Sequence, residues 1–265
     1  MTTIIPGTHA SNLIRQDFHQ QIALNRLTGY DNVQKFGRNS DIDTAAAEDI
    51  WLVGGVAPTY TAAIEVAIIS SDTNDTAAGT GAQAVLIEYV NDSYDFASAT
   101  IETNGTSEST QTIDDLIHLN RARVTRVGTF GGSNIGTLTI RISSGGASVA
   151  QIAAGFGRTE RTHFLIARNY EATLDNLYVS VDSAKTTSAT LFVQTNYNDV
   201  TTPFSGAKQV LYGFTGLSGF ASEDFHKSPP TITETPARIW WEADVGSNNT
   251  EVRAGYGLTL YNIAS

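Results

Sequence analysis

The side chains best suited to binding an ion lie in the stretch SSDTNDTAAGTGAQ, residues 70–83. Asp72 and Asn74 match the first two ligand positions of a helix-flanked calcium loop. The central glycine comes too late, at Gly79, no glutamate follows where that loop needs one, and the flanking segments resemble strands. A non-standard cation site built from Asp72, Asp75 and backbone carbonyls is the alternative interpretation of this stretch.

A phosphate-binding role for the same stretch has less support. The segment GTGAQA is followed neither by a Lys-Ser/Thr pair nor by a predicted helix, so neither nucleotide fingerprint is met. Aspartate and asparagine favour turns, and glycine permits positive φ. We therefore expect residues 70–83 to form a long connection between two strands.

Residue sets for catalysis are scarce in this sequence. No histidine has a second one at metal-chelating spacing, and GGSNIG (131–136) lacks the spacing of a nucleophile elbow. Acidic residues are plentiful, but sequence alone cannot pair two of them across a cleft as a glycosidase requires. With no cysteine there is neither a disulfide nor a thiolate ligand. We expect a non-enzymatic protein with no catalytic residue, no metal and no cofactor. The histidines are His9, His19, His118, His163 and His226.

The composition argues against nucleic acid and membranes as partners. The net charge is −11, and only 16% of the 265 residues are charged, against a usual value of about 25%. The one basic segment, RARVTR (121–126), is too short for a nucleic-acid groove, and an acidic chain is repelled by anionic lipid. No apolar run approaches the roughly 20 residues needed to cross a bilayer. The first residues lack the pattern of a secretory leader.

Two regions differ in their patterning. Residues 1–45 read as an extended, partly helical arm, because residues 11–31 place Leu13, Phe18 and Ile22 along an approximate helical stripe and the rest has no clear period. Such an arm is readily explained if it lies on a partner subunit. Packing on its own domain is the alternative.

From Trp51 onward apolar residues recur with period two. Examples are GTLTIRIS (136–143) and NLYVSVD (176–182), and roughly ten such runs are bounded by turn-forming residues. No helical segment separates them, so a parallel α/β sheet is not expected. We predict an all-β protein whose residues 46–265 form one β-sandwich of jelly-roll type.

Four blocks resemble a known family. They are GRNSDIDTAAAEDIWLVGG (37–55), SSDTNDTAAGTGAQAVLIEYV (70–90), NRARVTRVGTFGGSNIGTLTIR (120–141) and AQIAAGFGRTERTHFLIA (150–167). In this order they are similar to virion structural proteins of tailed bacteriophages, common in marine phages. The resemblance implies a structural β-protein of the particle with no catalytic residues. It also implies that DTAAGTGA fixes a strand connection. The chain departs from the family at residues 88–89, where glycine is usual.

The resemblance and the arm together predict a bacteriophage virion component: a capsid decoration or cement protein, or an appendage attached to head or tail. It would act through protein–protein interfaces as a homo-oligomer, with a trimer as one arrangement, and would contact major capsid or tail proteins. Its place would be the virion, assembled in the host cytoplasm. The residues expected at interfaces are Leu13, Phe18, Ile22, Phe36, Trp51, Trp240 and Trp241.

A carbohydrate-binding, lectin-like sandwich for host attachment is the alternative function, since jelly rolls also occur in lectins. Trp240 and Trp241 are adjacent, so on a strand they point to opposite faces. One belongs in the core, and the other would serve an interface or a ligand platform. An interface is favoured, because tryptophan is enriched there.

Overall fold

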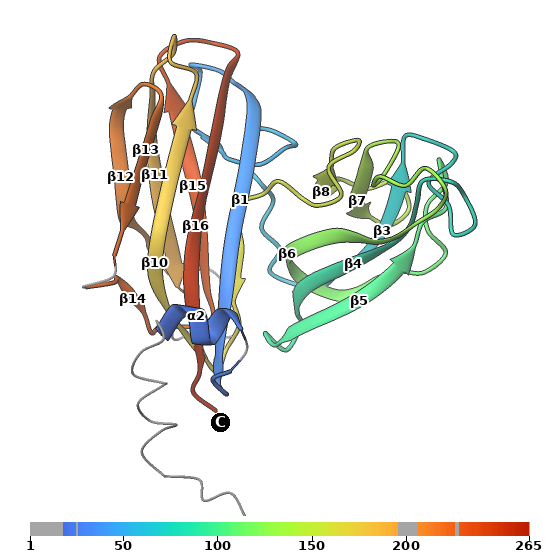
Figure 1. The fold of residues 1–265 in the computed structure, drawn as a ribbon, viewed down its shortest axis with the longest axis horizontal. Coiled ribbons are helices and arrows are strands. Elements are labelled where there is room, and N and C mark those ends of the chain that lie inside the picture. Colours follow the sequence, from blue (N-terminus) through green and yellow to red (C-terminus); the bar gives the residue numbers. More distant parts are fainter. Residues whose placement is uncertain (1–17, 25, 196–205, 226–227, 265) are drawn as a thin grey trace, which may run out of the picture.

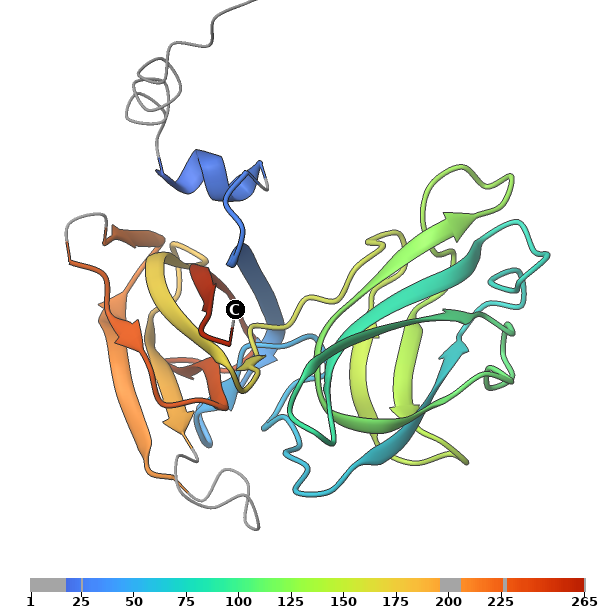
Figure 2. The ribbon, with the colours of Figure 1, turned by 90° about the horizontal axis from the view of Figure 1, so that it is seen from below.

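The computed structural model describes residues 18–24, 26–195, 206–225 and 228–264. Nearly all regular structure in this part of the chain is antiparallel strand, and the one described helix is the short α2 (Phe18–Ala23). The all-β prediction is therefore confirmed. Figures 1 and 2 show two β-units side by side, a tall sandwich and a curled sheet next to it.

The sandwich consists of two facing sheets. Sheet A has the strand order β1-β16-β10-β13, with β14 also paired to β10. Sheet B has the order β12-β11-β15-β2, with β9 paired to β15. The strands of sheet A are β1 (Tyr30–Ile42), β10 (Tyr170–Val181), β13 (Phe220–Asp224), β14 (Thr231–Ile232) and β16 (Thr250–Asn262). Those of sheet B are β2 (Glu48–Asp49), β9 (Phe164–Ile166), β11 (Thr187–Thr195), β12 (Lys208–Leu217) and β15 (Ala237–Val245).

The strand order identifies the sandwich as a jelly roll. Without the short β9 and β14, its strands in chain order are β1, β2, β10, β11, β12, β13, β15 and β16. The first then pairs with the last, the second with the seventh, the third with the sixth, and the fourth with the fifth. Pairing of this kind arises when one long antiparallel hairpin is wound around a barrel axis, which makes two linked Greek keys. The predicted jelly-roll type is confirmed by this order.

Side-chain alternation builds the core between sheets A and B. Along β10 the buried positions include Leu177, Val179 and Val181, whereas the residues between them are partly exposed. Trp241 fills the centre and is fully buried, and Tyr256 donates a 2.7 Å hydrogen bond to the carbonyl oxygen of Thr162. The core therefore satisfies its buried polar groups while removing large apolar surfaces from water.

The second unit, which we call the insert, lies in the chain between β2 and β9 and spans residues 64–152. Its six strands form sheet C in the order β5-β4-β6-β3-β7-β8, with a hydrophobic core separate from that of the sandwich. A jelly roll tolerates such an insertion because the chain leaves the sandwich and returns to it within a single connection between two strands. The strands are β3 (Ile64–Ser70), β4 (Ala82–Asn91), β5 (Phe96–Glu102), β6 (Ile113–Val127), β7 (Leu138–Ile142) and β8 (Ser148–Ile152).

The domain boundaries differ from those expected. The arm was expected to span residues 1–45, yet β1 lies within that range and pairs with β16 from Tyr30↔Tyr261 to Ile42↔Thr250. Its inward positions include Lys35, Gly37 and Asn39, so the strand lacks the apolar alternation by which sequence reveals strands. Residues 46–265 likewise hold two units and not one sandwich.

Gly37 offers a test of how closely β1 is packed against the segments that enter and leave the insert. A Cβ there would lie 2.5 Å from the Ile50 carbonyl oxygen and 2.6 Å from Thr162 Cγ2. Because both obstacles are in tightly packed segments, Gly37→Ala is expected to lower the free energy of unfolding by about 2 kcal/mol. Gly213→Ala is the matched control, since its nearest neighbour would be 3.6 Å away. Equal melting temperatures of the two variants would contradict this packing.

Candidate functional site: a buried polar junction

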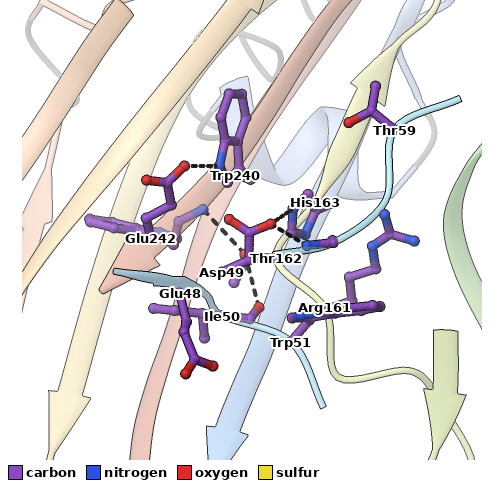
Figure 3. A network of polar contacts seen from close by, with 12 residues as sticks. Glu48, Asp49, Ile50, Trp51, Thr59, Arg161, Thr162, His163, Trp240 and Glu242 are labelled. Atoms are coloured by element: carbon purple, nitrogen blue, oxygen red, sulfur yellow. Dashed lines mark hydrogen bonds and ion pairs between the residues drawn. The ribbon is translucent and has the colours of Figure 1, made fainter. Parts of the chain in front are cut away.

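Where the chain leaves the sandwich for the insert and returns, polar side chains gather in the interior. Asp49 ends β2, Arg161 and His163 come on the returning segment, and Arg238 and Trp240 belong to β15. All five are at most 9% exposed. Figure 3 shows the labelled members of this group around Asp49. We call these five residues, together with Trp51 and His118 beside them, the junction.

Asp49 is the acidic centre of the junction. Its Oδ2 accepts a 2.7 Å hydrogen bond from the backbone N–H of Ala57 and a 3.1 Å bond from His163 Nε2. Burial raises the pKa of this carboxyl above its ordinary value, and the hydrogen bond from Ala57 acts against that rise. Asp49 therefore joins β2 to the segment that enters the insert and to the segment that returns from it.

Two arginines lie beside this carboxylate, each over an indole ring. The guanidinium of Arg161 lies 5.7 Å from the Trp51 ring centroid, and that of Arg238 lies 4.1 Å from the Trp240 centroid. Burial, with the nearby Arg238, lowers the pKa of Arg161 to about 10. Aromatic faces are favourable surroundings for guanidinium groups that have lost water, so the tryptophans compensate in part for their burial.

Two histidines complete the junction. The rings of His118 and His163 are 6.4 Å apart, and His163 stacks on Trp240 with an interplanar angle of 10°. Burial, with the charge of Arg161, lowers the pKa of both imidazoles well below 6.5. Both are therefore neutral in the folded protein at pH 7.

The chemistry of the junction is structural, although Asp49 and His163 form the kind of pair that activates a nucleophile. His163 Nδ1 and His118 Nε2 have no hydrogen-bond partner among the described residues. No hydroxyl or thiol among the described residues is hydrogen-bonded to these two ring nitrogens. The side chains of Asp49, His118 and His163 are at most 3% exposed. The arrangement holds segments together.

Further contacts tie the insert to the sandwich. The Lys35 ammonium of β1 donates to the Asn120 carbonyl oxygen of β6, and the Asn120 side chain exchanges hydrogen bonds of 3.0 and 2.8 Å with the backbone of Leu165. Arg38 of β1 also binds Glu160, on the segment that returns from the insert, through two hydrogen bonds of 3.1 and 3.0 Å. Bidentate pairs of this type fix geometry as well as charge. The two units are thus joined by side chains in addition to the two chain crossings.

The predicted interface tryptophans lie inside the chain. Trp51, Trp240 and Trp241 are 3%, 2% and 0% exposed, so their rings are covered by this chain's own residues. Trp240 and Trp241 do point to opposite faces of β15, one into the junction and one into the sandwich core. Trp240 serves a boundary between units of one chain, and sequence alone could not separate this from a boundary between subunits.

The other predicted interface residues are spread along the arm. Phe18 on α2 is 48% exposed, whereas Ile22 is buried. Phe36 in β1 is half-buried beneath the guanidinium of Arg158, 5.5 Å from its ring centroid. Leu13 lies outside the described residues. A subunit contact at Phe18 or Phe36 stays a prediction.

The loop of residues 70–83 is organised by Asp75. Its fully buried carboxylate accepts hydrogen bonds from the Ser70 hydroxyl at 2.7 Å and from the N–H groups of Ala82, Ile135 and Gly136 at 2.7, 3.0 and 2.8 Å. Donors of this kind occupy the lone pairs that a cation would need. Within the described chain, no group of three or more acidic, histidine or cysteine side chains could hold a metal ion. The loop is therefore a strand connection held by one carboxylate.

Comparisons with known proteins add little. No family model matches the chain, and no curated protein matches it significantly. The structure of infectious bursal disease virus Gx strain matches at 7% identity over 92% of this chain and 76% of that chain, with a TM-score of 0.24. The STIV MCP matches at 11% identity over 88% and 96%, also with a TM-score of 0.24. Scores this low carry no argument, so the fold assignment rests on the strand order. No helix in the described residues is long and apolar enough to span a membrane.

Asp75→Asn tests the role of the loop carboxylate. The amide would place an NH₂ group against N–H donors, so the free energy of unfolding is expected to fall by about 3 kcal/mol. Thermal unfolding followed by circular dichroism measures this loss. Asp72→Asn is the control, because Asp72 lies nearer the surface and accepts only from the backbone and side-chain nitrogens of Asn74. Comparable losses in both variants would contradict the special position of Asp75.

The two neutral histidines predict a loss of stability in acid. Their folded-state pKa values lie below 6.5, so their contribution is complete above about pH 6.5 and is lost as the pH falls towards those values. In that range, each histidine lowers the free energy of unfolding by up to about 1.4 kcal/mol per pH unit. The raised pKa of Asp49 has the opposite sign and offsets part of the loss.

The measurement is the melting temperature from about pH 8 to about pH 5. His118→Leu replaces the imidazole with a side chain of similar size that does not titrate. The melting temperature of this variant should therefore fall less steeply with decreasing pH than that of the natural chain. An unchanged slope would show that His118 takes no part in the acid response.

Proposed function

We propose that the chain is a structural component of a bacteriophage particle, as a capsid decoration or cement protein or an appendage on head or tail. The observation that carries the proposal is the jelly-roll strand order with a second β-unit inserted between its second and third strands. Jelly rolls are a common architecture of viral capsid proteins. In this role the protein works through interfaces, and catalysis has no part in it.

The resemblance blocks support the proposal through their place in the structure. The first block contains Asp49 and Trp51, the third contains Asn120, and the fourth contains Arg161 and His163. All of these residues belong to the junction or to the contacts that brace it. Three of the four blocks that resemble phage virion proteins therefore contain residues that fix the insert to the sandwich.

An exposed apolar surface at one end of sheet A suits a subunit contact. Phe18 and Tyr30 have ring centroids 5.3 Å apart, and Tyr30 lies 5.0 Å from Tyr261. Leu24 directly follows α2 and Ile263 directly follows β16, and they are 59% and 49% exposed. We call these five residues the end patch. Patches of this kind on soluble proteins often mark interaction sites.

The proposal is tested on particles. Mass spectrometry of virions purified from the host that carries this sequence is expected to find the chain at a copy number that matches a symmetric site. Its absence from intact particles, with the protein present only in the lysate, would refute the virion role.

Association through the end patch is tested in solution. Light scattering over a concentration series is expected to give a defined homo-oligomer for the natural chain. Phe18→Ser combined with Ile263→Ser should weaken association about tenfold or more, because two large apolar side chains lose their burial. Phe130→Ser, at a 55% exposed site on the insert, is the control. A monomeric natural chain would argue against self-association and leave binding to another virion protein as the route to assembly.

A further inference from the structure

A cleft of about 410 Å³ lies between the sandwich and the insert. One side is formed by β1, and the other by β4, β5 and β6, which face it across the gap between the two units in Figure 2. The volume is in the range of small-molecule sites, and boundaries between domains are where such sites commonly occur. The cleft is next to the junction but is open to solvent.

Aromatic rings form one wall of the cleft. Phe96 lies 5.9 Å from Phe164 and 4.9 Å from Tyr170, measured between ring centroids. All three residues line the cleft. The edge-to-face packing of Phe96 on Tyr170, at 61°, holds the rings in place and leaves an apolar surface for a flat ligand.

The Lys35 side chain lines the cleft at its inner end. Lys35 is 6% exposed, and its ammonium lies 6.0 Å from the Phe164 ring centroid. An ammonium has three donors, and the one hydrogen bond described for Lys35 goes to the Asn120 carbonyl oxygen. No ion pair joins Lys35 to a carboxylate in the described chain, since the nearby Glu88 is engaged by Arg121. Within the described chain, Lys35 is therefore a buried amine with no carboxylate in hydrogen-bond contact, and burial lowers its pKa well below the ordinary value.

The rim of the cleft offers both donors and acceptors. Arg121 and Glu88 form a bidentate pair, with Arg121 Nη2 at 2.9 Å from Glu88 Oε1. On β1, the Gln34 amide donates to Asn32 Oδ1 at 3.3 Å, and both side chains line the cleft. Hydroxyl groups both donate and accept hydrogen bonds, so a ligand rich in hydroxyls would use this rim fully.

We propose that this cleft binds an acidic saccharide, with the carboxylate of a uronic acid at the Lys35 ammonium and its sugar ring against the aromatic wall. The C–H face of a pyranose is apolar and fits the rings, while its hydroxyls meet Gln34, Asn32 and the Arg121–Glu88 pair. An acidic peptide also offers carboxylates and backbone N–H donors, so it is the competing ligand that the test includes. The proposal gives a site to the carbohydrate-binding alternative, and it holds whether or not the chain is part of a particle.

The test uses the full chain and two matched probes, tri-galacturonic acid and its methyl ester, in calorimetric titrations. The acid is expected to bind, and the ester, which lacks the charge, should bind at least about tenfold more weakly. Lys35→Met removes the ammonium at similar length and should reduce binding of the acid by the same factor. Lys185→Met changes a partly exposed lysine elsewhere in the sandwich, which does not line the cleft, and should leave binding unchanged.

The pH dependence gives a second readout that needs no variant. Burial and the charges of Arg161 and Arg121 lower the pKa of Lys35, whereas Glu88 raises it. A bound carboxylate favours the protonated amine, so affinity should fall as the pH rises through the pKa of the free protein. Affinity for the acid that is constant from about pH 6 to about pH 10 would overturn the role of Lys35.

Three other outcomes would overturn the proposal: no binding of the acid, equal binding of acid and ester, or binding of a tetraglutamate peptide in place of the saccharide. The last would make the cleft a docking site for protein. If Lys35→Met does not fold, Gln34→Ala on the exposed rim takes its place, with an expected loss of about threefold in affinity for the acid. An unchanged affinity would then count against the site.

Discussion

Burial of charge at the junction is the constraint on which the two-unit architecture depends. Arg161 and Arg238 have been removed from water together with two imidazoles, and Asp49 is the carboxylate placed among them. These groups stay buried only while the insert remains against the sandwich. Their burial is compensated only if Asp49 and the indole rings of Trp51 and Trp240 keep their positions. The geometry of the junction therefore admits little variation. The insert is therefore fixed to the jelly roll by buried side chains and does not depend on a flexible linker.

A second constraint comes from the closure of sheet A. Strand β1 lies between β16 and the returning segment, so it contacts both the sandwich and the route to the insert. Gly37 allows that close approach, and Lys35 extends from the same strand to the insert. The polar residues on the inner side of β1 follow from this position, because they face the junction in place of an apolar core.

The sequence predicts much of the fold and little of the junction. Apolar alternation identifies β10 and β11, because each buries one face in a common core. Both faces of β15 and β16 are largely buried, and their β-branched, leucine and aromatic residues identify them as strands. Alternation misses β1, whose inner face is polar. Alternation also cannot separate the insert from the sandwich, because apolar residues recur with the same period of two in the strands of both units. Asp75 lay in a stretch chosen for its acidic residues, but its hydrogen bonds to residues 135 and 136 depend on tertiary contacts. Arg161 and Arg238 gave no signal, since a charged residue in a strand ordinarily faces water.

The pairing of β1 with β16 also sets an order of events during synthesis. The insert has its own core, and all its strands are made within residues 64–152, so its contacts can form while the chain is still being extended. Sheet A cannot close until residues 250–262 have left the ribosome, because β16 separates β1 from β10. Until then β1 has no partner and must be kept from pairing with other chains. Its lysine, arginine and asparagine side chains, which suit the junction later, also keep this waiting strand soluble.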